Sequence, residues 1–508
     1  MLLSASGAGG LLSAFQAPNL DYTALGPEII LTATLVVAIL VDLALEERSK
    51  VWVTRLTGLG ILVSTLPIFY MASEGITGEA RVMFGGAYVT DTFALVLKAL
   101  LLMSGFVVFL LSFDYIAEGD YYEGEFAYMV LSSLLGMVVM ASARDLITIF
   151  VALELLSIPG YLLAGWRKRD QKSNEASLKY YLLGVLASSL MLYGMSLIYG
   201  FTGSLVLSEI GPKLAGQAGD KPIVAVAIFL VIVGFAFKIS AVPFHLWAPD
   251  TYEGAPTPVT AFLSVASKTA GFIALVELVY VAFLGRDDVT RPIFWVLAAL
   301  TMTIGNLTAL RQTNVVRLLA YSSVAQAGFI LVPFAVARPE EAQDYIAPTV
   351  VYLLLYAAMN LGAFAVVIAV ARRTGSGSIA SYRGLFAYAP GLSTIFSIFL
   401  LSLAGLPPLA GWYAKFAVIR SLFHDVTIWG VILGVIVAVN TAIAAAYYLS
   451  LVKEMFFKPV EEGVDTRPVS IPAPLLTALG LTAAFTVVLG FIPGAIATLG
   501  GKATLFGG

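Results

Sequence analysis

The stretch from Val231 to Lys268 reads VIVGFAFKISAVPFHLWAPDTYEGAPTPVTAFLSVASK. It begins as an apolar helix that carries Lys238 in its apolar part and meets Pro243 five residues later. A proline inside a helix removes one backbone hydrogen bond and clashes with the preceding turn. In a lipid bilayer such a break is tolerated only where protein or a water-filled cavity satisfies the freed backbone groups. A proline-rich turn and a second apolar helix with Lys268 follow, so the stretch predicts two membrane helices, the first of them broken.

The composition of the whole chain is that of a membrane protein. Its 508 residues are 59% hydrophobic and 12% charged, and the mean hydropathy is +0.92. A polytopic membrane protein reaches such values, whereas a soluble domain of this length does not. The net charge of −3 provides no basic surface for nucleic acid.

Several kinds of site are excluded by residue type. The chain has no cysteine, which excludes disulfides, thiolate zinc sites and iron–sulfur ligation. The two histidines, His245 and His424, are too few and too far apart to predict a haem or metal cluster. No glycine-rich nucleotide motif sits on a strand–helix unit. We therefore predict no metal or cofactor site in this chain.

Apolar runs of about 20 residues predict membrane helices. The run 391–424 is too long for one straight span and contains Gly405, Pro407 and Pro408, so we expect a second broken helix there. The connectors are short and leave no room for a second domain. About fourteen spans are predicted, near 27–45, 54–72, 91–113, 126–142, 145–165, 177–200, 221–247, 257–284, 292–310, 314–336, 348–371, 391–424, 427–456 and 472–497.

The two broken helices suggest an internal duplication. Residues 126–284 would form one repeat of five spans and residues 292–456 the other, with the broken helix fourth in each. Because five is odd, the second copy would be inverted in the membrane, and paired broken helices of this kind mark transport sites. Residues 1–125 would add three spans, and 472–508 a last span and a tail. We expect residues 1–508 to form a single all-α membrane domain.

The placement of lysine and arginine predicts the orientation. Short cytoplasmic loops are enriched in these residues, and most of those outside the spans follow odd-numbered spans, although the loops 114–125 and 248–256 hold none. Both termini are therefore expected outside. The first twenty-odd residues lack the positive start of a signal peptide, and we interpret them as a tail.

Glu154 and Lys238 have opposite charges and lie near the middle of their spans. A charged residue at a helix centre costs roughly 2.5–3.5 kcal/mol on insertion scales and needs a partner or water. An ion pair would lower the cost of both charges, and its separation would let the lysine release a proton. This pattern predicts a switchable proton carrier. The alternative is a static pair that holds two helices together, although buried ion pairs are poor stabilisers.

Lys268 has no counter-charge within a helical turn, which favours a neutral lysine and a proton relay. The alternative is a contact with an acidic group on another helix. His245 follows Lys238 by seven residues and can both donate and accept, so it would bridge toward Lys268 through water. Capping of freed carbonyls at the break is an equal alternative for this histidine.

Lys415 follows Pro408 by seven residues, in the second half of the other broken helix. Its position beside the break favours function, and snorkelling to the interface is the alternative. Lys98, which could also snorkel, and Glu277, near the end of its span, are expected to be structural. His424 lies at a span end and is predicted to be a surface residue.

Three segments resemble signature sequences of the antiporter-like subunits of respiratory complex I. They are AFKISAVPFHLWAPDTYEGAPTPVTAFLSVASK (236–268), ALELLSIPGYLLAG (152–165) and SLAGLPPLAGWYAKF (402–416). The resemblance covers essentially the whole chain. It implies fourteen helices with two inverted five-helix repeats, and a proton-pumping subunit in the membrane arm of an NADH:quinone oxidoreductase.

The resemblance also assigns roles to individual residues. The family's glutamate on the fifth span matches Glu154, and its lysines on the seventh and eighth spans match Lys238 and Lys268. The lysine on the twelfth span matches Lys415, and the family's histidine matches His245. From the run of deep ionisable residues near two helix breaks we also predict a mechanism. Quinone reduction in other subunits would change the pairing of Glu154 with Lys238, and Lys238 would then pass its proton through water and His245 toward Lys268 and on to Lys415.

The resemblance places the cofactors and partners outside this chain. NADH, FMN, iron–sulfur clusters and quinone would belong to the assembled complex. The expected partners are other membrane subunits, with K, J, A and the antiporter-like subunit M as neighbours, and the lipid of a bacterial plasma membrane. The chain ends after span fourteen and lacks the long lateral helix of subunit L. A sodium–proton antiporter subunit and a non-conducting spacer are the rival functions.

Overall fold

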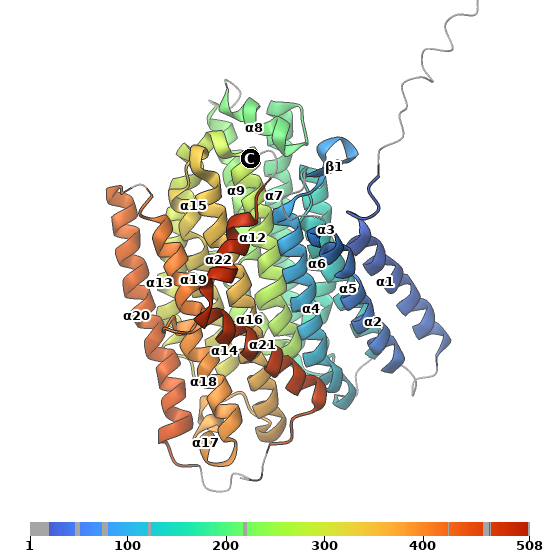
Figure 1. Ribbon diagram of the computed structural model, residues 1–508, viewed down its shortest axis with the longest axis vertical. Helices are drawn as coiled ribbons and strands as arrows, with labels where there is room; N and C mark the ends of the chain where they lie inside the picture. Colours follow the sequence, from blue (N-terminus) through green and yellow to red (C-terminus); the bar gives the residue numbers. More distant parts are fainter. Residues whose placement is uncertain are drawn as a thin grey trace, which may run out of the picture.

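Long apolar helices run side by side along most of the molecule (Figure 1). In the computed structural model, eleven helices among the described residues are long and apolar enough to cross a membrane, and three shorter apolar helices accompany them. The predicted polytopic, helical membrane architecture is confirmed. The expected N-terminal tail lies mostly outside the described residues, which are 20–45, 51–73, 80–119, 123–216, 221–424, 426–460, 467 and 469–505.

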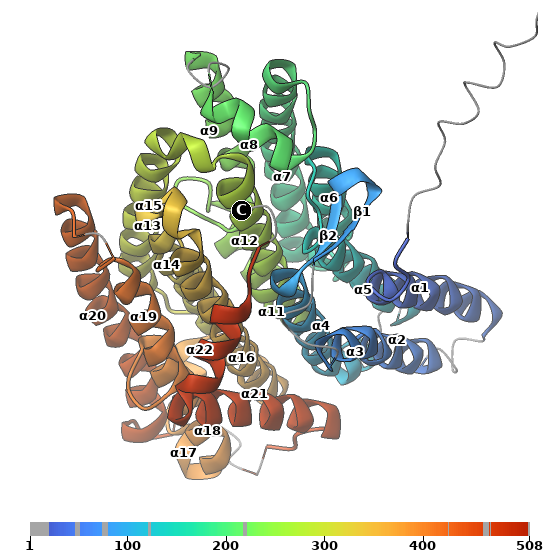
Figure 2. The ribbon, with the colours of Figure 1, turned by 45° about the horizontal axis from the view of Figure 1, so that its top comes forward.

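The first half of the chain forms one side of the bundle, and Figure 2 shows α1 to α3 at one edge and α20 at the opposite edge. The elements of the first half are α1 (Gly26–Ala44), α2 (Val51–Val63), α3 (Leu66–Ser73), α4 (Thr92–Glu118), α5 (Glu123–Met140), α6 (Leu146–Ala164), α7 (Gln171–Thr202), α8 (Leu207–Ala215), α9 (Pro222–Lys238), α10 (Trp247–Gly254), α11 (Thr257–Phe262) and α12 (Lys268–Glu277).

The second half completes the bundle. Its α-helices are α13 (Asp287–Ala309), α14 (Val315–Ile330), α15 (Val332–Val336), α16 (Ala342–Thr374), α17 (Leu385–Tyr388), α18 (Pro390–Ala404), α19 (Ala410–Ser421), α20 (Ile428–Phe457), α21 (Ala473–Phe491) and α22 (Pro493–Lys502). Short 3₁₀ segments are η2 (Phe84–Gly86), η5 (Leu284–Arg286), η6 (Pro339–Glu341) and η7 (Ile379–Tyr382).

Both predicted helix breaks are present. The helix α9 ends at Lys238, and residues 239–246 separate it from the short α10. Lys238 is therefore the last helical residue before the break and not a mid-helix residue, because the helix ends five residues ahead of Pro243. The second break separates α18 from α19, where Gly405 adopts a φ of 90° that favours glycine.

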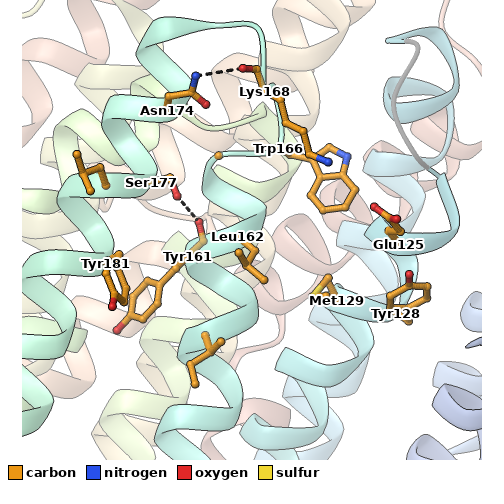
Figure 3. Close-up of a pocket in the computed structure, with 13 residues that line it drawn as sticks. Glu125, Tyr128, Met129, Tyr161, Leu162, Trp166, Lys168, Asn174, Ser177 and Tyr181 are labelled. Carbon is orange, nitrogen blue, oxygen red and sulfur yellow. Dashed lines mark hydrogen bonds between the residues drawn. The ribbon is translucent and has the colours of Figure 1, made fainter.

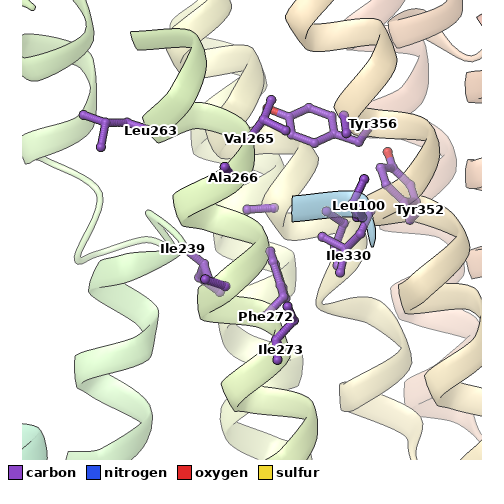
Figure 4. Close-up of a cluster of buried hydrophobic side chains, with 14 of the residues drawn as sticks. Leu100, Ile239, Leu263, Val265, Ala266, Phe272, Ile273, Ile330, Tyr352 and Tyr356 are labelled. Carbon is purple, nitrogen blue, oxygen red and sulfur yellow. The ribbon is translucent and has the colours of Figure 1, made fainter. Parts of the chain in front are cut away.

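The span that carries Lys268 lies at the centre of the bundle. The central span, Thr257–Ala282, is fully buried, as expected for a helix that is apolar on all sides. Two π-helical segments interrupt it, η3 (Leu263–Ser267) and η4 (Leu278–Ala282). Figure 4 shows the apolar cluster that surrounds it, with side chains from the central span beside Tyr352 and Tyr356 of α16.

The all-α prediction misses one hairpin. The strand β1 (Arg81–Met83) pairs antiparallel with β2 (Tyr88–Thr90) at the end of the bundle that also carries α8 (Figure 1). The turn between them needs positive φ angles, which Gly85 and Gly86 supply at 65° and 91°. Each strand is only three residues long, which is too short for the alternation of polar and apolar residues that predicts a strand.

Candidate functional site

Lys238 lies in a pocket of hydroxyl groups. Its side chain is buried, and its Nζ atom donates to Ser157 Oγ on α6 at 2.9 Å and to the Tyr180 hydroxyl on α7 at 3.2 Å. Both partners are neutral acceptors. The ammonium group is therefore held without a carboxylate in hydrogen-bond contact.

Glu154 and Lys238 both belong to the described part of the chain, and the ion pair expected between them is not formed. Glu154 lies one helical turn before Ser157 on α6, and its buried Oε1 atom has no hydrogen-bond partner. Residues three apart share one helix face, and Glu154 acts electrostatically on Lys238. The structure thus contains the separated form of the pair, because the hydroxyl of Ser157 holds the lysine instead.

Aromatic rings fix the position of Tyr180. Its ring stacks on Trp247 with centroids 4.3 Å apart, and Trp247 Nε1 donates to the Phe237 carbonyl at 2.9 Å. The Ser240 amide donates to the same carbonyl at 3.0 Å. Trp247 therefore links the end of α9 to α10 and supports the tyrosine that contacts Lys238.

A groove of about 840 Å³ opens between α5, α6 and α7 (Figure 3). Tyr161 lines it, and the ring of Tyr161 lies 4.7 Å from that of Tyr180, measured between centroids. Lys168 and Asn174 stand at its polar end. Two adjacent tyrosines therefore separate this groove from Lys238.

Buried hydroxyl groups lie close in the chain to both lysines. Ser240 follows the end of α9, Tyr252 lies on α10, and Ser267 directly precedes Lys268 on the central span. Their hydroxyl oxygens have no direct hydrogen-bond partner among the described residues. Buried polar groups normally require partners, so this region is polar although apolar helices surround it.

Lys268 contacts the helix α14 and no acidic residue among those described. Its Nζ atom donates to both the carbonyl and the Oγ atom of Ser323, each at 2.6 Å. Ser323 Oγ in turn accepts a hydrogen bond from the Tyr356 hydroxyl at 2.9 Å. The alternative expected for Lys268, an acidic partner on another helix, is therefore wrong for the described residues.

Polar side chains continue along α14 toward the second break. Gln326 lies one turn after Ser323, and its Nε2 atom donates to the Leu403 carbonyl at 3.1 Å. Its Oε1 atom accepts a hydrogen bond from the Tyr352 hydroxyl, and its Nε2 atom also lies 3.3 Å from the Tyr448 hydroxyl. These side chains come from α14, α16 and α20, and they connect Lys268 with the end of α18.

Lys415 is buried and points into the second break. Its Nζ atom donates to the Ala404 carbonyl, the last of α18, at 2.8 Å, and lies 4.7 Å from the centre of the Phe329 ring. The snorkelling alternative is therefore wrong, because the side chain turns inward to satisfy a carbonyl that the break has freed.

His245 lies within the first break, buried, with its Nδ1 atom unpartnered among the described residues. Among the described residues, no hydrogen bond joins it to Lys238 or Lys268. The relay role and the capping role expected for His245 both stay predictions.

Lys98 and Glu277 are fully buried. Lys98 pairs with Glu28 at 2.8 Å, and Glu277 pairs with Arg144. Snorkelling of Lys98 is therefore wrong. The sequence alone did not predict this ionic cluster, because its members come from α1, α4, the α5–α6 connection and α12, which are distant in sequence.

His424 is exposed as predicted and lies 3.6 Å from Asp344. With Glu341 these residues bring three donor atoms within 4.8 Å of one another. All three are exposed, and such acidic groups are common on protein surfaces, so the cluster does not define a metal site.

Apart from the charged residues of the ionic cluster, the residues that sequence reasoning missed are neutral. They are Ser157, Tyr180, Ser322, Ser323, Gln326, Tyr352, Tyr356 and Tyr448. The run YSSVAQAG (321–328) in an otherwise apolar span was the one available signal for those on α14. Single hydroxyls elsewhere are ordinary in membrane helices.

Comparisons with known proteins agree with one another. A family model described as NADH:quinone oxidoreductase/Mrp antiporter, TM matches residues 143–441. The NADH-quinone oxidoreductase subunit N of Trichlorobacter lovleyi is 39% identical over 486 residues, covering 95% of this chain and 96% of the relative.

The chain is also similar to chains of solved membrane complexes. A chain of respiratory complex I from Thermus thermophilus is 32% identical with a TM-score of 0.76, and the match covers 93% of this chain and 98% of that one. A chain of the archaeal membrane-bound sulfane sulfur reductase is 26% identical with a TM-score of 0.84, covering 95% and 97% respectively. The matched family region, 143–441, includes every candidate residue from the sequence.

Proposed function

Because this chain belongs to the NADH-quinone oxidoreductase subunit N family, we propose that it is a proton-translocating subunit in the membrane arm of that complex. Protons move along Glu154, Lys238, Lys268 and Lys415. The observation that carries this route is that all three lysines are buried at or beside irregular helix geometry and, among the described residues, hydrogen-bond to neutral groups.

The switch lies at Lys238. In the separated form its ammonium binds Ser157, and Glu154 stands one turn away on the same helix face. A side-chain shift of about one turn, roughly 5 Å, would restore the ion pair. The charged lysine is favoured in the paired form and the neutral lysine in the separated form. Changes in neighbouring subunits that open or close this pair would therefore load or release a proton.

The proton then passes across the central span. In this proposal the carriers are hydroxyls: that of Tyr180, which Lys238 contacts, and the unpartnered ones of Ser240, Tyr252 and Ser267. Water is the usual partner of buried hydroxyls that lack one in the protein, and His245 extends this polar region at the break.

From Lys268, the route follows α14. Ser323 and Gln326 lead to the carbonyls of Leu403 and Ala404, and Lys415 binds the second of these. The π-helical segment η3 directly precedes Lys268, and such segments often accompany functional sites. The route therefore joins the two broken helices.

We further propose fourteen membrane helices in two inverted repeats of five. The eleven long and three shorter apolar helices of the described residues supply that number, and the breaks after α9 and α18 would be equivalent. We also propose that both termini lie outside a bacterial plasma membrane. Thr504 accepts a hydrogen bond from the Phe93 amide at the start of α4, so the end of the described chain lies beside the start of that helix.

The redox chemistry belongs to other subunits in this proposal. NADH, FMN, iron–sulfur clusters and quinone bind elsewhere, and this chain contributes a non-redox translocase module. Its neighbours would be the membrane subunits K, J and A and the antiporter-like subunit M.

The test is Lys238→Met in the assembled complex, reconstituted into vesicles. We expect NADH:quinone turnover under a protonophore to persist and the proton-to-electron ratio to fall. Lys213→Met, on the exposed surface of α8, is the matched control. An unaltered ratio would contradict the route, and sodium-dependent exchange without NADH would favour an antiporter function.

A further inference from the structure

A buried ionic cluster lies at the end of the bundle that carries β1, β2 and α8. Lys98 of α4 pairs with Glu28 of α1 at 2.8 Å, and the Tyr88 hydroxyl donates to the same Glu28 oxygen at 2.6 Å. Lys98 also lies 3.2 Å from that hydroxyl. This half of the cluster contains one cation and one carboxylate.

The other half is centred on Arg144, in the connection between α5 and α6. Its NH2 atom donates to Asp91 Oδ2 at 2.8 Å, and its NH1 atom donates to Glu277 Oε1. Asp91 also accepts the Ala94 amide at 2.8 Å as the cap of α4. The two halves are joined by α4, because Asp91 caps the start of this helix and Lys98 lies about two turns later on it.

Two carboxylates of the cluster share one cation. Among the described residues, Arg144 pairs with both Asp91 and Glu277, whereas Glu28 pairs with Lys98. Glu277 is 0% exposed, and its Oε2 atom has no hydrogen-bond partner among the described residues. A buried carboxylate that shares its cation with a second carboxylate takes up a proton more readily than one with a cation of its own.

Glu277 also shares a helix with Lys268. Nine residues separate them on α12, which is about 13 Å along the helix axis. The buried hydroxyl of Thr269 lies between them in sequence and is likewise unpartnered among the described residues. The central span therefore joins the middle of the membrane to the ionic cluster.

We propose that Glu277 is a proton-holding site that connects Lys268 with the aqueous side next to β1, β2 and α8. In the protonated form Oε1 accepts from Arg144 and Oε2 carries the exchangeable proton. The charge around Glu277 is set by Lys98, Glu28, Tyr88 and Asp91. This inference rests on the proposed proton route and adds an access point to it.

The test uses the whole complex in vesicles, with Glu277→Gln and Glu277→Asp compared. Glutamine keeps an acceptor for Arg144 and the volume of the protonated carboxyl but cannot release a proton. We expect Glu277→Gln to assemble, to retain uncoupled NADH:quinone turnover and to pump fewer protons per electron. Glu277→Asp should keep a ratio closer to that of the unmodified complex.

Two results would overturn the inference. One is an unchanged proton-to-electron ratio in Glu277→Gln. The other is a Glu277→Gln complex that fails to assemble while Glu277→Asp assembles, because the carboxylate charge would then be required for folding. Lys238→Met, measured in parallel, separates the two proposals: if it lowers the ratio and Glu277→Gln does not, only the access point is wrong. If Glu277→Gln alone lowers the ratio, the route through Lys238 is wrong.

Discussion

Lys238 donates a hydrogen bond to Ser157 at 2.9 Å, although Glu154 lies one turn away on the same helix. The lysine is the last residue of α9, and the serine belongs to α6. A neutral hydroxyl thus competes with a carboxylate for one ammonium group. Under the proposed route, this competition would make the charge state of Lys238 sensitive to small movements of α6 against α9.

Ser157→Ala removes the partner that holds the separated form. A hydrogen bond of this kind contributes about 1 kcal/mol, so we expect the population of the Glu154-paired form to rise by roughly fivefold. The coupled rate of proton pumping should fall while the complex still assembles. The measurement is the initial rate of acidification in vesicles, normalised to electron transfer.

The matched control is Ser173→Ala. Ser173 is also buried and donates to a backbone carbonyl, that of Ala164, but contacts none of the candidate lysines. Equal effects of the two substitutions would assign the change at Ser157 to packing.

Gln326→Leu interrupts the polar path along α14. It leaves the Tyr352 hydroxyl and the Leu403 carbonyl without their present partner, which costs about 1–3 kcal/mol for each unsatisfied group. We expect a lower melting temperature and reduced pumping with electron transfer retained.

Gln312→Leu is the control for that experiment, because Gln312 donates only to the Thr308 carbonyl near the end of α13. If Gln326→Leu and Gln312→Leu pump the same number of protons per electron, the result would argue against a proton path along α14.

Gly271 allows α12 to approach Lys238 closely. A Cβ atom at this position would lie 2.9 Å from Ile239 Cγ2 and 3.3 Å from Lys238 Cγ. Gly271→Ala should therefore displace Lys238 and destabilise the protein by about 1–3 kcal/mol, as overpacking usually does. Thermal unfolding and the pumping ratio are the measurements.

Gly480→Ala on α21 should be harmless in comparison, since no atom lies within 4 Å of its Cβ position. If both alanine variants behave alike, the close approach at Gly271 has no role in positioning the lysine.

Asp250 on α10 gives a pH-dependent prediction. Burial raises the pKa of its carboxyl, but hydrogen bonds from Lys179 and Arg317 outweigh burial and lower the pKa below 3.8. A lowered pKa in the folded state stabilises at pH values above the unfolded pKa, and the contribution disappears as the pH falls through the folded pKa.

Asp250→Asn should therefore be less stable than the unmodified protein at pH 7, by about 1 kcal/mol for such partly exposed pairs. The difference should narrow only below pH 3.8. Melting temperatures of the purified complex across this range test the prediction, and identical melting temperatures at pH 7 would contradict it.

The helices and their breaks were predictable because their causes are local. A run of apolar residues forms a membrane helix wherever it occurs, and Pro243 or Pro407 interrupts a helix by its own covalent structure. The position of Lys238 at the helix end was predicted less well, because the helix stops before the proline and not at it.

The buried lysines were likewise visible in the sequence, since a charge within an apolar run stands out. Their partners were not. Ser157 is 81 residues from Lys238, and Ser323 is 55 residues from Lys268. Which hydroxyl faces which lysine depends on the rotation and register of helices that are distant in sequence. The sequence pattern of an apolar helix predicts neither its rotation nor its register.

The sequence by itself determined a polytopic helical membrane protein with cations at two broken helices, because hydropathy, charge and proline act within a single segment. The tertiary structure decided that Lys238 meets Ser157 and Tyr180 in place of Glu154. It also decided that Glu28, Asp91, Lys98, Arg144 and Glu277 form one cluster. Such contacts form only when separate helices pack together, and the packing geometry decides which side chains meet.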